Sequence, residues 1–225
     1  MRILVAGGEG YLGSMICNLL AADHTVTSID LGWFGNTELD EKVNTVRGDI
    51  LGLRSLEIFD TVINAAGVSD NKMADFATDD TFARNVGGAF YLANLARLGA
   101  VKQFVQISDC AVYGDSNKTR TERSRPACVD AYGMSKLCAE KTIANLCDKK
   151  TKVCVLRMGD LFGVSPRMRY DIHVNKLYEQ AITENKIFVP DETRPLLNVE
   201  DAARSVKFVV DKKLFGTYNV AAFNC

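Results

Sequence analysis

The segment Ile3–Gly13 reads ILVAGGEGYLG, an apolar run that ends in a cluster of glycines. An amphipathic run follows over residues 15–20, so the pattern predicts a strand, a tight turn and a helix. The backbone N–H groups at the start of such a helix lie at the positive end of its dipole, where an anion binds without a charged side chain. Glycine is needed in the turn because a Cβ would block the bend and keep a pyrophosphate at a distance.

The glycine spacing fits a dinucleotide fingerprint in two registers, G-x-G-x-x-G and the looser G-x-x-G-x-x-G. The glycines that create these matches are Gly7, Gly8, Gly10 and Gly13. A second strand, expected over residues 25–29, is followed by Asp30 at about the spacing of 20 residues that the fingerprint requires. A carboxylate there accepts from both hydroxyls of an adenosine ribose and repels a 2′-phosphate, which favours NAD over NADP. The alternative is that Asp30 is a solvated residue at a strand end.

Composition restricts the class of protein. The chain has 225 residues, 47% of them hydrophobic and 24% charged, as expected for a globular protein. The net charge of −1 gives no electrostatic basis for binding nucleic acid, and we expect no such partner. We expect no membrane association, because no apolar run reaches membrane-spanning length. The first strand starts at Met1–Ile3, which leaves no room for a signal peptide and predicts a cytoplasmic protein.

Cysteine and histidine usage excludes several kinds of site. The seven cysteines form no C-x-x-C pair and their number is odd, so we expect reduced thiols and neither a disulfide framework nor a zinc site. With only His24 and His173, the chain has little material for histidine-based metal or triad chemistry. We therefore expect no metal.

Strand and helix patterns alternate along the chain, which predicts an α/β fold with a doubly wound parallel sheet covered by helices on both faces. The further strands are expected over residues 43–46, 61–64, 101–107 and 216–221. We expect a single Rossmann-type domain over residues 1–225, in which residues 163–197 contribute a small, truncated substrate lobe. Trp33 and Phe34 follow the second strand, and either wall an adenine or pack beneath their loop.

Small and polar residues follow the predicted strands, at the sheet edge where open α/β folds bind ligands. Asp49 can accept a hydrogen bond from an adenine amino group. The run Ala65-Ala66-Gly67 lets a cofactor lie against the strand end. A helical region is expected over residues 78–98, and its interior Asn85 is either exposed or holds backbone groups together.

Tyr132 and Lys136 lie four residues apart on a predicted helix and therefore share a face. An ammonium near a phenol stabilises the phenolate and lowers the phenol pKa from about 10 toward neutrality. The pair is thus predicted to form a proton-transfer group matched to alcohol oxidation or carbonyl reduction.

At this point the sequence resembles the extended branch of the short-chain dehydrogenase/reductase superfamily, and is similar to its NAD-dependent nucleotide-sugar epimerases and dehydratases. The motifs that carry the resemblance are Gly7/Gly10/Gly13, Asp30, Asp49-Ile50, Ala65-Ala66-Gly67, Asn85, Val112-Tyr113-Gly114, Tyr132/Lys136, Leu156-Arg157, Phe162-Gly163, Arg194-Pro195 and Val199-Glu200-Asp201.

The resemblance implies NAD as cofactor, a nucleotide sugar as substrate and a role for each motif. Tyr132 would be the acid/base, Lys136 would hold the nicotinamide ribose, and Asn85 would support the active-site backbone. Arg194 would meet a substrate diphosphate through its guanidinium fork, with Asp160 at a second substrate position. The implied cofactor contacts are Gly7, Gly10, Tyr11, Leu12, Asp30, Asp49, Ile50, Ala65, Ala66, Gly67, Asn85, Tyr132, Lys136, Met158 and Gly159.

One departure from the family concerns the position of the catalytic Ser or Thr, five residues before the Gly of the Val-Tyr-Gly motif. Asp109 stands there, and Ser108 is one position early, which in a strand means the opposite face. An ionised Asp109 would raise the pKa of Tyr132. The alternatives are a protonated Asp109 that donates to a substrate oxygen, or a bulge that re-aims Ser108.

Other departures concern the substrate. Cys110-Ala111 replaces the Asp-Glu pair of the family's dehydratases, so dehydratase chemistry is not expected. Asp160 and Asn198 replace a usual Asn and His, and family members continue well past residue 216, so part of the substrate lobe is expected to be missing.

The sequence favours an NAD-dependent enzyme that acts on a nucleotide sugar with Tyr132 as base, and the alternative is a non-catalytic NAD-binding sensor or regulatory subunit. Asp109 favours the second hypothesis, whereas the intact pair of Tyr132 and Lys136 favours the first. The resemblance also implies a homodimer through the helices that hold Asn85 and Tyr132. The apolar positions of these helices equally fit burial against the sheet; they include Phe90, Leu92, Leu95, Leu137 and Ile143.

Overall fold

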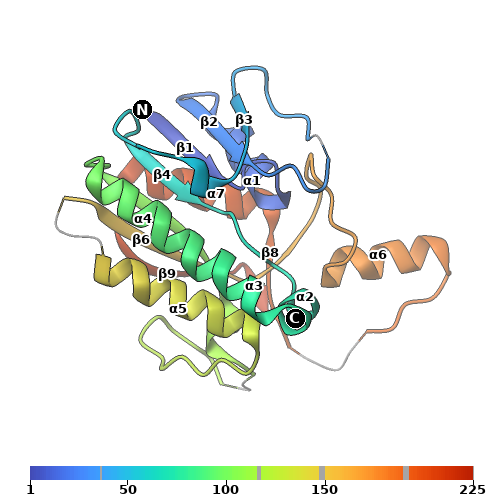
Figure 1. Cartoon of the computed structure of the whole chain (residues 1–225). Helices are drawn as coiled ribbons and strands as arrows, with labels where there is room; N and C mark the ends of the chain where they lie inside the picture. The colour runs from blue at the N-terminus through green and yellow to red at the C-terminus, as the bar shows by residue number, and fades with distance from the viewer. Residues whose placement is uncertain (36, 116–117, 147–149, 190–192, 225) are drawn as a thin grey trace.

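A computed structural model of the chain describes residues 1–35, 37–115, 118–146, 150–189 and 193–224. Its centre is a sheet of seven parallel strands in the order β3-β2-β1-β4-β5-β6-β9. The strand bounds are β1 Arg2–Ala6, β2 Thr25–Asp30, β3 Asn44–Arg47, β4 Thr61–Asn64, β5 Gln103–Asp109, β6 Lys152–Met158 and β9 Gly216–Val220. The order reverses between β1 and β4, so the predicted doubly wound parallel sheet is confirmed (Figure 1).

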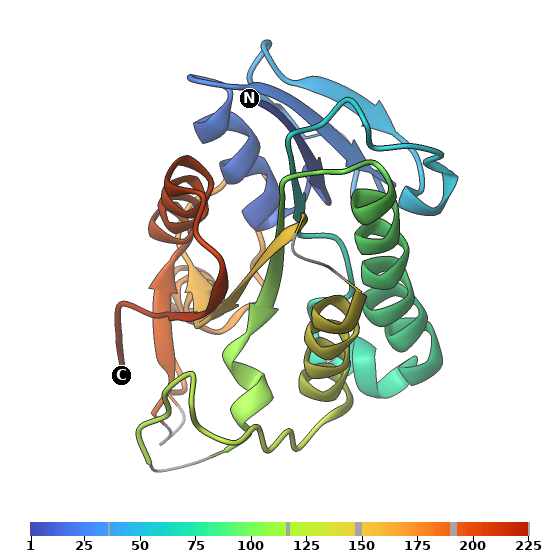
Figure 2. The ribbon, with the colours of Figure 1, turned by 90° about the vertical axis from the view of Figure 1, so that its left-hand side faces the viewer.

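Helices cover both faces of this sheet, as Figure 2 shows. Helices α1 (Tyr11–Leu20) and α7 (Val199–Lys212) pack together on one face, and α4 (Gly88–Leu98) and α5 (Ala131–Leu146) pack together on the other. A parallel sheet needs cover on both faces because its crossover connections place helices there and its strands are apolar on both sides. The two layers leave the carboxyl ends of the strands as the edge available to a ligand.

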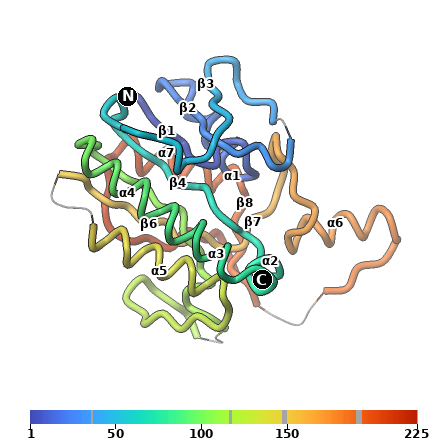
Figure 3. The backbone as a smooth tube through the Cα atoms, viewed as in Figure 1, coloured from blue at the N-terminus to red at the C-terminus, as the bar shows by residue number. Residues whose placement is uncertain are grey.

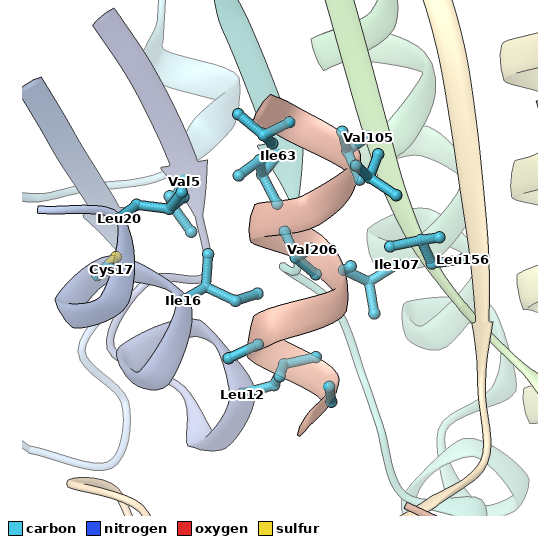
Figure 4. Close-up of a cluster of buried hydrophobic side chains, with 14 of the residues drawn as sticks. Val5, Leu12, Ile16, Cys17, Leu20, Ile63, Val105, Ile107, Leu156 and Val206 are labelled. Carbon is cyan, nitrogen blue, oxygen red and sulfur yellow. The ribbon is translucent and has the colours of Figure 1, made fainter. Parts of the chain in front are cut away.

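The core beneath α1 and α7 is aliphatic. Figure 4 shows Ile16 and Leu20 of α1 and Val206 of α7 directed at side chains of the central strands, among them Val105 and Leu156. Each fully buried Leu, Ile or Val side chain stabilises the fold by about 1.5–3 kcal/mol relative to an exposed one. This core fixes the start of α1, and with it the glycine turn, against the sheet.

The helical region predicted over residues 78–98 is continuous but not uniform. Helix α3 (Thr78–Phe82) passes into a π-helical segment (η2, Ala83–Gly87) before α4 begins. Single π turns inside α-helices insert an extra residue and re-aim the side chains near it. Here the π segment contains Asn85, which is buried.

Two strand boundaries differ from the sequence prediction. Strand β3 covers Asn44–Arg47, one residue later than expected, and β5 covers Gln103–Asp109 rather than residues 101–107. The second shift matters because it places Ser108 and Asp109 inside the strand, in register with Arg157 and Met158 of β6. Their side chains therefore point to opposite faces.

A smaller three-stranded sheet extends the molecule beyond β6. It has the order β10-β8-β7, with β7 at Asp160–Phe162, β8 at Pro195–Asn198 and β10 at Phe223–Asn224. Helix α6 (His173–Thr183) lies between β7 and β8 in the chain and stands away from the main sheet (Figure 1). The lobe expected over residues 163–197 thus corresponds to α6 and its flanking segments, of which residues 190–192 lie outside the described part.

The helices expected to form a dimer bury most of the apolar positions named for it. Leu92 of α4 and Leu137 and Ile143 of α5 are buried within the chain, whereas Phe90 is exposed. Among the described residues, we find no helix with both the length and the apolar composition needed to cross a membrane.

Candidate active site

The glycine turn between β1 and α1 is built by backbone sterics. Gly7 has φ +76°, a left-handed conformation that side chains rarely adopt, and a Cβ on it would lie 2.7 Å from the Ala66 nitrogen. A Cβ on Gly13 would lie 1.9 Å from the carbonyl oxygen of Gly7. The turn can therefore approach both β4 and its own helix only because these positions carry no side chain.

The start of α1 is left open toward this turn. The N-cap residue is Gly10, which has no side chain to accept a hydrogen bond from the N–H groups of the first turn. The first turn of α1 also carries no acidic residue. The helix N-terminus therefore keeps the backbone donors that bind an anion. Glu9 precedes the helix, is buried, and pairs with Arg47 at 3.6 Å, so its negative charge is offset beside the site.

Asp30 lies at the carboxyl end of β2, beside the turn. Its Oδ2 accepts from the Glu9 nitrogen at 3.1 Å and its Oδ1 accepts from the Gly32 nitrogen at 2.9 Å. Each carboxylate oxygen has a second lone pair, so both oxygens can still accept from ribose hydroxyls. Asp30 is thus fixed by its neighbours and is not merely a solvated strand end.

The aromatic pair after β2 is held by two arginines. The guanidinium carbon of Arg84, in the π segment, lies 4.2 Å from the ring centre of Trp33, and that of Arg167 lies 5.1 Å from the ring centre of Phe34. Trp33 is 52% exposed and Phe34 73% exposed, so neither packs beneath the loop. Figure 3 shows the loop after β2 reaching the segment between β7 and α6 beside the start of α1.

The residues after β3 and β4 lie at the same edge. Asp49 is exposed and caps a short 3-10 helix (η1, Ile50–Gly52) by accepting a hydrogen bond from the Leu51 nitrogen at 2.9 Å. Ala65 and Ala66 continue from β4 beside Gly7. At Gly67, with φ +140°, a Cβ would lie 2.3 Å from the Oδ1 of Asn85, so the chain passes close to that side chain.

Asn85 ties two parts of the site together. Its Oδ1 accepts from the Val68 nitrogen at 2.7 Å, and its Nδ2 donates to the Val68 oxygen at 3.0 Å and to the Ser135 Oγ at 2.9 Å. Of the two alternatives that the sequence left open, exposure of Asn85 or a role in holding backbone groups together, the structure shows the second. It links the segment after β4 to α5.

Tyr132 and Lys136 share one face of α5, as predicted, and both are buried. The Lys136 Nζ lies 5.5 Å from the centre of the Tyr132 ring. The Tyr132 hydroxyl donates to Oδ2 of Asp109 at 3.0 Å, and Oδ1 of Asp109 accepts from the Ala111 nitrogen at 2.8 Å. The three side chains form a compact group at the carboxyl end of β5.

The charges in this group oppose the phenolate of Tyr132. Burial, the charge of Asp109 and the hydrogen bond to it raise the Tyr132 pKa well above its ordinary value of about 10. The expectation that Lys136 brings this pKa toward neutrality is therefore wrong for the structure described here. Burial also raises the pKa of Asp109 to about 6 and lowers the pKa of Lys136.

Ser108 points away from this group. Its Oγ donates to Oε1 of Glu140, two turns further along α5 than Tyr132, and Glu140 forms a bidentate ion pair with Arg157, with Nη2–Oε2 at 2.6 Å. Arg157 in turn donates to the hydroxyl of Tyr113 at 2.6 Å. No bulge re-aims Ser108, so this residue anchors α5 to β5 and β6 and does not reach the acid/base site.

The predicted residues after β6 lie where the chain leaves the main sheet. Met158 is buried at the end of β6, and Gly159 passes so close to β8 that a Cβ would lie 2.4 Å from the Pro195 oxygen. The next residue, Asp160, pairs with Arg194 at 2.8 Å. The two candidate substrate residues therefore contact each other.

Sequence reasoning missed two residues that join the sheet edge to α6. Asn175 donates to the Tyr11 hydroxyl at 3.2 Å and to the Arg169 oxygen at 2.8 Å. Arg169 donates to Ser69 Oγ at 2.8 Å, and its charge acts on both Tyr11 and Tyr132. No local pattern marks either residue, because each acts on partners far away in the sequence.

Across the described ranges, no group of three or more His, Cys, Asp or Glu side chains is placed to hold a metal ion.

Comparisons with known proteins identify the family of the chain. The sequence model of the NAD dependent epimerase/dehydratase family matches residues 3–221. A UDP-glucose 4-epimerase of Dictyostelium discoideum is 29% identical over an alignment of 183 positions, which covers 73% of this chain but only 53% of that protein. A UDP-glucose 4-epimerase of Bacillus subtilis is 26% identical over 253 aligned residues, covering 96% of this chain and 75% of that protein.

A solved structure of similar fold is UDP-glucuronic acid 4-epimerase from Bacillus cereus in complex with UDP-glucuronic acid and NAD. It superposes with a TM-score of 0.89 at 22% identity, over 100% of this chain and 79% of that one. This likeness shows the shared fold, and the family match extends over nearly the whole chain. The chain belongs to the NAD dependent epimerase/dehydratase family.

Proposed function

We propose that this chain binds NAD along the carboxyl edge of its sheet and acts on a nucleotide sugar, with Tyr132 as the group that exchanges a proton with the sugar hydroxyl. The observation that carries the proposal is the placement of two unlike features on one edge. An open helix N-terminus with a glycine turn lies after β1, and the group of Asp109, Tyr132 and Lys136 lies after β5.

The residues present fit the cofactor. The absence of side chains on Gly7 and Gly13 lets the turn pack tightly against β4 and the start of α1, and the α1 amides would supply the donors for a pyrophosphate. Asp30 would bind the adenosine ribose, and Asp49 and Ile50 would lie near the adenine. When bound, NAD supplies an acceptor for hydride from the sugar carbon.

The chain's own residues would orient the substrate and move its proton. Tyr132 lies buried on α5, where its hydroxyl can reach a sugar hydroxyl on the side away from Asp109. Lys136 places a positive charge behind the phenol ring. The planar guanidinium of Arg194 suits a diphosphate. When the substrate binds, the ion pair between Arg194 and Asp160 would open so that Arg194 could contact the diphosphate.

The UDP-glucose 4-epimerases and UDP-glucuronic acid 4-epimerase among the similar proteins support a nucleotide sugar as the substrate class. They share the family and the fold, whereas Asp109 at the expected Ser/Thr position sets this chain apart from the family pattern. We therefore propose an epimerase-type or related hydride transfer, with the nucleobase and sugar to be identified by experiment.

One observation favours a second function, that of a non-catalytic NAD-binding regulatory or sensor protein. Burial, the charge of Asp109 and the hydrogen bond to it raise the pKa of the Tyr132 phenol, the wrong direction for a simple base, and the ion pair with Asp160 occupies Arg194. A protein that kept the fold and lost the chemistry would show these features.

Turnover separates the two functions. The purified chain is loaded with NAD and incubated with UDP-, GDP- and dTDP-sugars, and reduced nicotinamide absorbance and altered sugar are followed. We expect turnover with at least one sugar nucleotide and a loss of about 10²–10⁴-fold in Tyr132→Phe, the usual contribution of acid/base catalysis. Tyr178→Phe, an exposed site on α6, is the matched control. Bound NAD without turnover across the panel would favour the sensor.

A homodimer and a cytoplasmic location are also part of the proposal. The exposed side chains of Phe90 on α4 and Met134 on α5 offer apolar area for a second copy to cover. Gel filtration with light scattering is expected to give twice the chain mass of 24.7 kDa, and a monomer mass would remove the dimer.

A further inference from the structure

Asp109 stands where the family pattern has a Ser or Thr, and its carboxylate gives the proton of Tyr132 an acceptor that a hydroxyl would not provide. Resting on the proposed function, we propose that Asp109 is the terminal proton acceptor of the site: it takes the phenolic proton of Tyr132 as Tyr132 takes a proton from the substrate hydroxyl. Asp109 acts through Tyr132 and does not touch the substrate. The structure then needs no free phenolate at any stage.

Geometry carries the inference. The Tyr132 hydroxyl already donates to Oδ2 of Asp109 at 3.0 Å, within the range of a normal hydrogen bond. The other oxygen, Oδ1, is fixed by the Ala111 nitrogen at 2.8 Å, where Asp109 caps the 3-10 helix η3 (Cys110–Tyr113). The carboxylate is therefore held with one oxygen aimed at the phenol. A serine at this position has a single hydroxyl with no negative charge, and could not accept a proton in this way.

The Asp109 pKa is set first by burial, which raises it, and then by the hydrogen bond from the Ala111 nitrogen, which lowers it, and by groups on α5 and β7. Lys136, on α5, lowers the Asp109 pKa, as does the hydrogen bond from Tyr132 of the same helix. Asp160 of β7 raises the Asp109 pKa, and Arg169, from the segment before α6, acts on Tyr132. Burial is the largest influence and places the Asp109 pKa at about 6. Asp109 is thus a stronger base than an ordinary carboxylate and is still mostly ionised at neutral pH.

The proton transfers balance. The substrate O–H bond breaks and an O–H bond forms at the Tyr132 oxygen, while the original Tyr132 O–H bond breaks and an O–H bond forms at Oδ2 of Asp109. Tyr132 remains a neutral phenol, and the carboxylate becomes a neutral carboxylic acid. The electron pair left on the substrate oxygen forms the carbonyl bond as hydride leaves the carbon for the oxidant of the proposed function, a nicotinamide dinucleotide. The reverse transfers return the proton.

Infrared spectroscopy of the ligand-free full chain tests the shared proton without turnover. The difference spectrum between the native chain and Asp109→Asn isolates the carbonyl band of the protonated Asp109. We expect this band to appear as the pH falls through about 6. In Tyr132→Phe the midpoint should rise, because the hydrogen bond that lowers the Asp109 pKa is gone. Asp75→Asn, which removes an exposed carboxylate on helix α2 (Asn71–Phe76), should leave the band unchanged.

Kinetics supply the second arm, with a sugar nucleotide found in the turnover panel. The native rate should fall below a pH of about 6, where Asp109 is already protonated. At neutral pH Asp109→Asn should lose about 10²–10⁴-fold, a difference that narrows below a pH of about 6, and Asp109→Glu should recover part of the loss. Asp109→Ser, which restores the family residue, should lack the limb near pH 6.

The outcomes separate the two levels of the proposal. An active native chain whose Asp109→Ser or Asp109→Asn variant is as fast or faster overturns the relay and leaves the proposed function standing. An Asp109 band with the same midpoint in Tyr132→Phe also overturns the relay. A native chain that binds NAD but turns over no sugar nucleotide overturns the proposed function and the relay with it.

Discussion

The glycine turn after β1 and the acid/base group after β5 lie on the same sheet edge but are held by different kinds of interaction. The turn depends on missing side chains: a Cβ on Gly7 or Gly13 would overlap backbone atoms. The acid/base group depends on three ionisable side chains whose pKa values are set by burial and by one another. The steric constraints on the glycines do not change with pH or ligand, whereas the protonation states of the three ionisable side chains do. The first region should therefore behave as a fixed cradle and the second as a group whose protonation state varies.

The largest effect is expected in the turn. In Gly13→Ala the new Cβ would lie 1.9 Å from the Gly7 oxygen, so the turn or the start of α1 must move. We expect loss of NAD binding and a free energy of unfolding lowered by about 2 kcal/mol or more. Urea unfolding and calorimetry measure these two quantities.

The control for that variant is Gly52→Ala, in η1, where a Cβ would meet nothing within 4 Å. It should bind NAD as the native chain does. Equal binding by both variants would show that the cradle is not where the cofactor binds.

The next effect concerns pH and the acid/base group. The unfolded chain releases the Asp109 proton near pH 3.8, whereas the folded chain holds it to about 6. Because the folded state binds more protons between these values, the stability contribution of this group is present at low pH and is lost as the pH rises through this window. The loss is of the order of 3 kcal/mol for a shift of about two units.

Asp109→Asn removes the titrating group. Relative to the native chain, the variant should gain stability between pH about 4 and pH about 7 and then stay level. Urea unfolding at several pH values measures the difference. A difference that does not vary with pH would show that Asp109 is not buried as an ionisable group.

The smallest effect is expected where the cradle meets the loop after β2. Arg84→Ala removes the guanidinium over Trp33, an exposed contact worth about 0.5–1 kcal/mol. Trp33 is the only tryptophan of the chain, so its fluorescence reports on this loop directly. We expect the emission to change in Arg84→Ala and to change in the native chain when NAD is added.

Arg97→Ala is the control, since Arg97 contacts only its own helix through Asn94 among the contacts seen in the described residues. It should leave Trp33 emission as in the native chain. Identical Trp33 spectra for the native chain and Arg84→Ala would contradict the observed stacking.

The fold could be predicted from the sequence because its determinants are local. The alternation of apolar strands and amphipathic helices predicts the parallel sheet, and the glycine spacing predicts the turn. The two-residue period of a strand also predicts that Ser108 and Asp109 make different contacts, and they do: Ser108 bonds to Glu140, whereas Asp109 accepts from Tyr132, eight residues earlier on α5.

The chemistry of the site could be predicted only in part, because it depends on contacts between distant segments. The pKa of Tyr132 follows from burial and from Asp109, 23 residues away, rather than from Lys136 on its own helix. Asn175 and Arg169 bind Tyr11 and Ser69 across more than 90 residues of sequence, and no spacing rule marks them. The π segment that contains Asn85 is likewise not predicted from the sequence, which indicates one continuous helical region.

Calorimetric titration of the purified native chain with NAD tests the central claim most directly. The account predicts saturable binding of one NAD per chain, weakened or lost in Gly13→Ala and kept in Gly52→Ala. A native chain that gives neither binding heat nor thermal stabilisation with NAD or NADH would contradict it.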